Sequence, residues 1–87
     1  MDKIWHDEAW EEYLEWQRKD RQTLRKINKL IQDIERNGYK CTGQPEMLSG
    51  NKAGFWSVRI DKKNRIVFRI SDGSLEIVQC GAHYDDK

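Results

Sequence analysis

The sequence predicts an α+β fold in which an N-terminal helical hairpin packs on one face of a mostly antiparallel sheet of four to five strands. Three runs rich in Val, Ile and Phe, typical of strands, occupy residues 55–60, 65–70 and 75–80. Asp72-Gly73, between the last two runs, is a strong signal for a two-residue hairpin turn. Two stretches before the runs carry apolar residues three or four positions apart, which is the spacing of amphipathic helices.

The composition is that of a small folded protein without a membrane segment. The 87 residues predict one domain, residues 1–87, with a small core. No apolar run is long enough to span a bilayer, and the N-terminus lacks the apolar region of a signal peptide. Cys41 and Cys80 are too few for a disulfide framework or a metal cluster. We therefore expect a cytoplasmic protein with reduced thiols and neither a metal nor a cofactor.

Charge is unevenly distributed along the chain. Residues 1–17 hold one Lys and six acids, a net of −5, and residues 70–87 hold one Lys and four acids, a net of −3. Residues 18–69 hold fourteen Lys or Arg and five acids, a net of +9. A basic middle between acidic ends can meet a polyanion with the middle alone, although a merely solvated charged surface fits the same numbers.

The first elements predicted are a short strand and a helix. Lys3–Trp5 reads as the strand, and Asp7 and Glu8 suit a helix N-terminus because negative charge there meets the helix dipole. One face of this helix is marked by Trp10, Tyr13, Leu14 and Gln17. Trp16 lies off that stripe. It is either a second packing contact or part of a partner surface, and we favour packing.

A second helix follows after a short connection, which predicts an antiparallel pair. Asp20 can cap it, it runs to about Arg36, and Asn37-Gly38 is a credible stop. Its predicted buried stripe consists of Leu24, Ile27, Ile31 and Ile34. Basic residues lie away from that stripe at Arg21, Arg25, Lys26 and Lys29.

Residues 37–54 hold four glycines and the only proline, so we expect an irregular loop with a turn of helix near Met47. The loop leads directly into the first C-terminal strand. Glu46 can therefore hang over one face of that strand. A loop glutamate is usually just solvated, and this one is of interest only if cationic groups converge on it.

Alternation along the strands separates apolar from basic side chains. The apolar set expected against the core is Trp56, Val58, Ile60, Ile66, Phe68 and Ile70. Burying this set fixes the register and places Arg59, Arg65 and Arg69 on the opposite face. A two-residue turn at Asp72-Gly73 then pairs Ser71 with Ser74, Ile70 with Leu75, Arg69 with Glu76 and Arg65 with Cys80.

Arg69 with Glu76 is an ordinary cross-strand ion pair. Arg59 and Arg65 have no acidic partner in this register. Two guanidinium groups on one face predict a phosphate site, because the planar fork matches phosphate geometry.

Neither histidine is placed in that site by the sequence alone. Strict alternation puts His83 on the apolar side with Ile77 and Gln79, whereas a bulge or bend at Gly81 reverses this. His6 precedes a helix and reads as a cap or a surface residue.

Motifs in a fixed order run through essentially the whole chain. In the first half they are Ile4-Trp5, Trp10 with Tyr13-Leu14, Trp16-Gln17, Lys26-Ile27-Asn28 and Leu30-Ile31. In the second half they are Gly43-x-Pro45-Glu46-x-Leu48, Gly54-Phe55-Trp56-Ser57-x-Arg59-Ile60, Arg65-Ile66-Val67 and the terminal His83-Tyr84. With this order and spacing, the chain resembles the YoeB branch of the RelE-like toxins, which are ribosome-dependent mRNA interferases of bacterial toxin–antitoxin pairs.

The resemblance implies a microbial-RNase-like site on a RelE-like fold. Glu46 matches the general base, Arg65 the main transition-state arginine and His83 the general acid, while Arg59 and Tyr84 match supporting substrate-binding positions. The residue types suit attack of a ribose 2′-OH on the adjacent phosphorus, without a metal. The chain departs from the family at Met47, Ser49 and Val58, and it extends past the usual His-Tyr end.

The function that the resemblance implies is cleavage of mRNA in the ribosomal A site, which inhibits translation. The implied partners are mRNA, the 70S ribosome on its 16S rRNA side and a Phd/YefM-like antitoxin, with operator DNA bound only together with the antitoxin. A homodimer is also compatible. The alternative is a non-catalytic RNA- or protein-binding module on the same scaffold, and a third possibility is an unrelated small structural domain.

Overall fold

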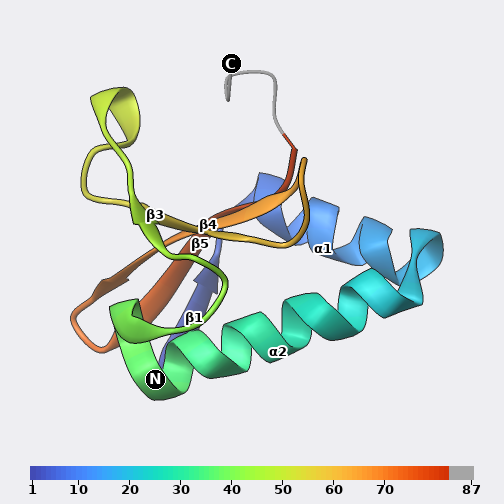
Figure 1. Cartoon of the computed structure of the whole chain (residues 1–87), viewed down its shortest axis with the longest axis horizontal. Helices are drawn as coiled ribbons and strands as arrows, with labels where there is room; N and C mark the ends of the chain where they lie inside the picture. Colours follow the sequence, from blue (N-terminus) through green and yellow to red (C-terminus); the bar gives the residue numbers. More distant parts are fainter. Residues whose placement is uncertain (83–87) are drawn as a thin grey trace.

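The computed structural model describes residues 1–82 and contains two helices and one five-stranded sheet (Figure 1). The elements in chain order are β1 (Asp2–Trp5), α1 (Asp7–Lys19), α2 (Arg21–Asn37), the 3₁₀ turn η1 (Gly38–Lys40), β2 (Glu46–Met47), the 3₁₀ turn η2 (Gly50–Lys52), β3 (Trp56–Arg59), β4 (Arg65–Ser71) and β5 (Ser74–Gly81). The strand order is β1-β5-β4-β3-β2, with β1 parallel to β5 and the other pairs antiparallel. The predicted α+β class and mostly antiparallel sheet are confirmed.

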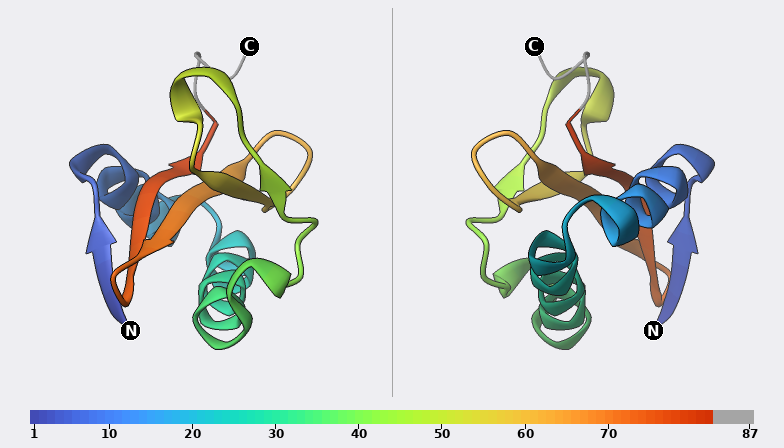
Figure 2. Two further views of the ribbon diagram at one scale, coloured as in Figure 1. Left: turned by 90° about the vertical axis from the view of Figure 1, so that its left-hand side faces the viewer. Right: turned by 90° about the vertical axis from the view of Figure 1, so that its right-hand side faces the viewer.

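Helix α2 lies against one face of the sheet (Figure 2), and its apolar residues belong to the core on that face. The Asp20 side chain accepts from the backbone N–H groups of Gln22 and Thr23, so the predicted cap is present. Four residues of α2 are buried: Ile27, Leu30, Ile31 and Ile34. Leu24 is only partly buried, whereas Leu30, which was not in the predicted stripe, is 6% exposed. A helix on a twisted sheet buries a broader stripe than the one marked by its most regular spacing.

The face predicted for α1 is confirmed only at Tyr13, which packs against the core, and is wrong for its other members. Trp10 and Leu14 are each 43% exposed, whereas Ala9 and Trp16 are buried. The reason is that α1 covers the edge of β5 beyond the point where β1 ends. There the Trp16 indole N–H donates to the Cys80 carbonyl at 2.9 Å, and the Cys80 backbone N–H donates to a Glu12 oxygen at 2.7 Å. Trp16 is therefore a packing residue, as favoured.

The hairpin between β4 and β5 forms at the predicted turn. Asp72 and Gly73 have φ of 53° and 75°, a conformation that glycine and aspartate tolerate better than most residues. The pairs Ser71–Ser74, Ile70–Leu75 and Arg69–Glu76 are confirmed.

The predicted pairing of Arg65 with Cys80 is wrong, because a β-bulge shifts the register farther along this hairpin. Phe68 pairs with Ile77 and Val67 with Gln79, which leaves Val78 as the extra residue. Arg65 consequently pairs with Gly81. The expectation that Ile77 and Gln79 share one side of the sheet fails for the same reason.

The core lies between the helices and one face of the sheet. Its fully buried members from the strands are Val58, Ile66, Phe68, Leu75, Ile77 and Cys80. The rings of Tyr39 and Trp56 stack at 4.6 Å between centroids and close one end of this core. The opposite face of the sheet, called the open face below, carries the alternating side chains that point away from the helices.

The segment between α2 and β3 is irregular, as predicted, but its helical turns lie at η1 and η2, and Met47 is in the short strand β2 instead. Gly43 lets this segment lie tightly against the core. A Cβ at position 43 would come within 3.0 Å of Leu30 Cδ2 and 3.1 Å of Val58 Cβ. The Gly43 carbonyl also accepts from the Arg59 backbone N–H at 2.8 Å, which anchors the segment beside β3.

Candidate active site

The predicted arginine face exists and lies on the open face of the sheet. Arg59 and Arg65 are direct partners across β3 and β4. Such partners have Cβ atoms about 5 Å apart and point to the same side, so the two side chains emerge together. Within residues 1–82 the Arg59 side chain makes no hydrogen bond or ion pair, and its backbone N–H bonds only the Gly43 carbonyl. The Arg65 side chain is held by a 3.5 Å hydrogen bond to Ser57 and a 3.8 Å ion pair with Glu46. Both guanidinium groups remain able to bind an anion.

Glu46 is brought to this face by β2. The two residues of β2 pair antiparallel with β3, which places Glu46 directly opposite Ser57. A Glu46 carboxylate oxygen lies 3.8 Å from Nη1 of Arg65, a loose ion pair in which the Glu46 side chain is 66% exposed. The carboxylate is thus close to a cation and still accessible to a substrate. A cationic group thus lies beside Glu46, which is the condition under which a loop glutamate becomes a candidate for function.

Ser57 is a polar residue beneath the site whose role the sequence reasoning did not recognise. It is 1% exposed, and its hydroxyl accepts a long hydrogen bond of 3.5 Å from Arg65 Nη1. Because Ser57 pairs with Glu46 on one side and lies diagonal to Arg65 on the other, it forms the floor between them. Its position on the same strand face as Arg59 was the available signal.

A second polar cluster lies farther along the open face. Arg69 donates from Nε and Nη2 to one oxygen of Glu76, at 3.1 and 2.7 Å, as the register predicted. His6 Nε2 lies 2.6 Å from the other Glu76 oxygen. The hydrogen bonds from Arg69, and then that from His6, lower the pKa of the Glu76 carboxyl. His6 occupies the N-cap position of α1 but makes no side-chain capping bond there.

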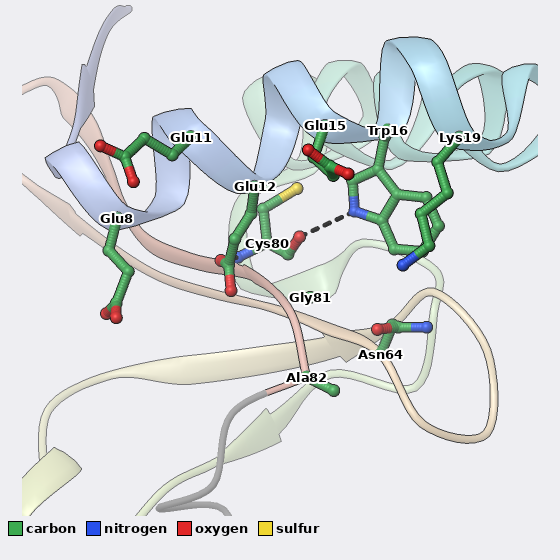
Figure 3. Close-up of a pocket in the computed structure, with 10 residues that line it drawn as sticks. All are labelled: Glu8, Glu11, Glu12, Glu15, Trp16, Lys19, Asn64, Cys80, Gly81 and Ala82. Atoms are coloured by element: carbon green, nitrogen blue, oxygen red, sulfur yellow. Dashed lines mark hydrogen bonds between the residues drawn. The ribbon is translucent and has the colours of Figure 1, made fainter.

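The hollow beside α1 is unsuited to RNA. It is lined on the helix side by Glu8, Glu11, Glu12, Glu15, Trp16 and Lys19, and on the other side by Asn64 and residues 80–82 (Figure 3). Four carboxylates against one ammonium give it a negative charge, which repels phosphate. The open face is therefore the better candidate for a polyanionic substrate.

The two thiols are buried and protonated at neutral pH. Burial, with a further contribution from Glu12, raises the pKa of Cys80 to about 12. Burial and then the charge of Asp33 raise the pKa of Cys41. Since the thiolate is the reactive form, neither cysteine is a candidate nucleophile.

Two of the predicted site residues, His83 and Tyr84, lie outside the described residues. Among residues 1–82 there is no cluster of three or more His, Cys, Asp or Glu side chains that could hold a metal ion. Neither helix within this range has the length and apolar character that a membrane crossing requires. The structure thus brings Glu46, Arg59 and Arg65 together and leaves the two terminal residues as predictions.

Comparisons with known proteins identify the family of this chain. A sequence model described as the YoeB-like toxin of bacterial type II toxin-antitoxin systems matches residues 5–84. The chain is 44% identical to toxin YoeB of Escherichia coli strain K12 over 84 residues, which covers 97% of this chain and all of that protein.

Solved structures agree with the sequence comparison. The YoeB/ParE toxin from Agrobacterium tumefaciens superposes with a TM-score of 0.91 at 41% identity, covering 97% of this chain and all of that one. The YoeB-YefM complex and the YoeB dimer, both from Staphylococcus aureus, give TM-scores of 0.89 and 0.87 at 33% and 34% identity, each covering 97% of this chain and 98% of that one. The chain therefore belongs to the YoeB-like toxins of bacterial type II toxin–antitoxin systems.

Proposed function

We propose that the chain is a ribosome-dependent endoribonuclease that cleaves mRNA in the ribosomal A site and so inhibits translation. The observation that carries this proposal is the meeting of Glu46, Arg59 and Arg65 on the open face, where a carboxylate lies 3.8 Å from one of two adjacent guanidinium groups. A binding module has no need of a general base beside its phosphate-binding groups. The alternative of a non-catalytic module is therefore the weaker reading.

Each residue has a defined part in the proposed reaction. Glu46 accepts the proton of a ribose 2′-OH, whose oxygen attacks the adjacent phosphorus. Arg65, with Arg59 beside it, stabilises the charge on the equatorial phosphate oxygens. His83 donates a proton to the departing 5′-oxygen, and Tyr84 supports the substrate. The products are a 2′,3′-cyclic phosphate and a 5′-hydroxyl, and this balance requires no metal.

Docking on the ribosome is assigned to the basic middle of the chain. Exposed side chains on the outer side of α2 are those of Arg21, Arg25, Lys26 and Lys29. We assign to them the contact with 16S rRNA, because phosphate contacts dominate the affinity for nucleic acids and make it salt-dependent.

Control of the toxin is assigned to a Phd/YefM-like antitoxin, which binds operator DNA together with it. The Staphylococcus aureus YoeB-YefM complex and YoeB dimer support such a partner and a homodimer. All of these encounters take place in the cytoplasm.

The decisive experiment is single-turnover cleavage of a defined mRNA on programmed 70S ribosomes. We expect a cut in the A-site codon and a 2′,3′-cyclic phosphate end. A matched mRNA with a single 2′-deoxy sugar before the scissile phosphate should not be cleaved at that bond. Binding to the ribosome without cleavage of either mRNA would favour the non-catalytic module instead.

A further inference from the structure

Arg69 is held as a fixed planar group on the same open face as the candidate active site. Its guanidinium carbon lies over the Phe55 ring, 4.5 Å from the centroid. Two hydrogen bonds to Glu76 fix its edge, and His6 fixes Glu76 in turn. The sheet register accounts for the contact between these two side chains, because Arg69 pairs with Glu76 across β4 and β5. Stacking on one side and bonding at the edge leave the group little freedom to rotate.

The charge of this group is compensated, which separates it from Arg59 and Arg65. Glu76 is only 19% exposed at its side chain and bonds Arg69 at 2.7 Å, so the pair is close to neutral. A neutralised guanidinium attracts phosphate weakly, but its plane can still stack. Proteins that read single-stranded RNA stack unpaired bases on aromatic rings and on guanidinium planes. With 42% of the Arg69 side chain exposed, a surface for such stacking remains.

We propose that Arg69, held between Phe55 and Glu76, forms a base-stacking subsite for an unpaired mRNA nucleotide that flanks the scissile phosphate. Arg69 is four residues from Arg65 along β4, which is about 13 Å at the rise of a strand. The subsite is thus separate from the phosphate position but within reach of a neighbouring nucleotide. This inference rests on the proposed function, since it assigns a further substrate contact to the same reaction. Purines should occupy the subsite better than pyrimidines, because their larger rings stack over more area.

The test is an abasic scan of the mRNA on programmed ribosomes. Each nucleotide flanking the cut is replaced in turn by an abasic site, and kcat/KM is measured for the wild-type protein and for Arg69→Lys. Lysine keeps the charge and a donor for Glu76 but lacks the plane. For the wild type, we expect one flanking position at which the abasic site lowers kcat/KM roughly 5- to 150-fold, the usual range for one stacked base.

For Arg69→Lys, the penalty at that one position should vanish while the penalties elsewhere persist. Arg36→Lys, a matched change in the last turn of α2, should retain the wild-type pattern. Thermal unfolding of both variants checks that the fold is intact. If Arg69→Lys lowers cleavage of every substrate equally, or keeps the full penalty, the subsite is overturned while the proposed function stands. If the wild type cleaves no substrate, the proposed function fails and the subsite falls with it.

Discussion

The two faces of the sheet differ in what holds their side chains in place. On the helix-covered face, Ile66, Phe68 and Ile77 are fully buried and fixed by packing. On the open face, Arg65 is held by a 3.5 Å hydrogen bond and a 3.8 Å ion pair, and Glu46 is largely exposed. The apolar face supplies the stability, and this allows the open face to keep cations that are poorly compensated within the fold. These cations are therefore available to bind a substrate.

The largest effect is expected on the open face, where a substitution should abolish most of the cleavage activity and leave the fold intact. Glu46→Gln keeps the shape of the side chain and removes the base. We expect single-turnover cleavage on programmed ribosomes to fall roughly 10²–10⁴-fold, the usual contribution of a general base. Glu11→Gln, at an exposed residue of α1 away from the open face, is the control for a lost negative charge and should cleave at the wild-type rate. Equal rates for wild type and Glu46→Gln would assign the base elsewhere.

The converse change removes stability from the covered face. Phe68 is completely buried, so Phe68→Ala leaves a cavity and should lower the free energy of unfolding by about 3–5 kcal/mol. Met47→Ala, at a side chain that is 66% exposed, should change it by less than about 0.5 kcal/mol. Urea denaturation measures both variants. A small loss for Phe68→Ala would mean that the helix-covered face is not the stabilising one.

The edge of the sheet offers an intermediate effect. Trp16→Phe keeps an aromatic ring, although a smaller one, and removes the indole N–H that donates to the Cys80 carbonyl. We expect a loss of about 1–3 kcal/mol, because the carbonyl is left buried without its donor. Trp10→Phe, on the exposed side of the same helix, should cost clearly less when both are denatured side by side. Similar losses for the two variants would contradict the assignment of Trp16 to the β5 edge.

The smallest expected effect is on the free energy of unfolding at acidic pH. Arg69 and His6 hold the pKa of Glu76 below its ordinary value of 4.5. A depressed carboxyl pKa stabilises the fold at pH values above the ordinary value, and this stabilisation is lost as the pH falls through the folded-state pKa. The difference in unfolding free energy between wild type and Glu76→Gln should therefore shrink between pH 6 and pH 3. A difference that stays constant would show that the charge of Glu76 does not contribute.

Sequence reasoning succeeded where one physical effect dominates. The α2 stripe follows from helical periodicity, the Asp72-Gly73 turn from positive φ, and the Arg59–Arg65 face from strand alternation. It failed at α1, because a helix that covers a strand edge is placed by hydrogen bonds such as that from Trp16 to Cys80, which periodicity does not encode. It also missed the bulge at Val78, because no glycine or other turn-forming residue marks that position in the sequence.

The candidate site was likewise predicted only in part. Glu46 and the two arginines meet as predicted, because β2 pairs beside β3. Ser57 and the link from His6 to Glu76 were not recognised, since both depend on which residues face each other across strands. The roles of His83 and Tyr84 stay predictions that come from the family resemblance.

The measurement that tests the central claim most directly is the single-turnover cleavage rate of Arg65→Ala on programmed ribosomes. Ribosome co-sedimentation and the unfolding midpoint are measured on the same preparation. Removing one group that stabilises transition-state charge should lower the rate roughly 10²–10³-fold while binding and the unfolding midpoint stay near those of the wild type. An unchanged rate, with the fold and ribosome binding intact, would contradict the assignment of the chemistry to the open face.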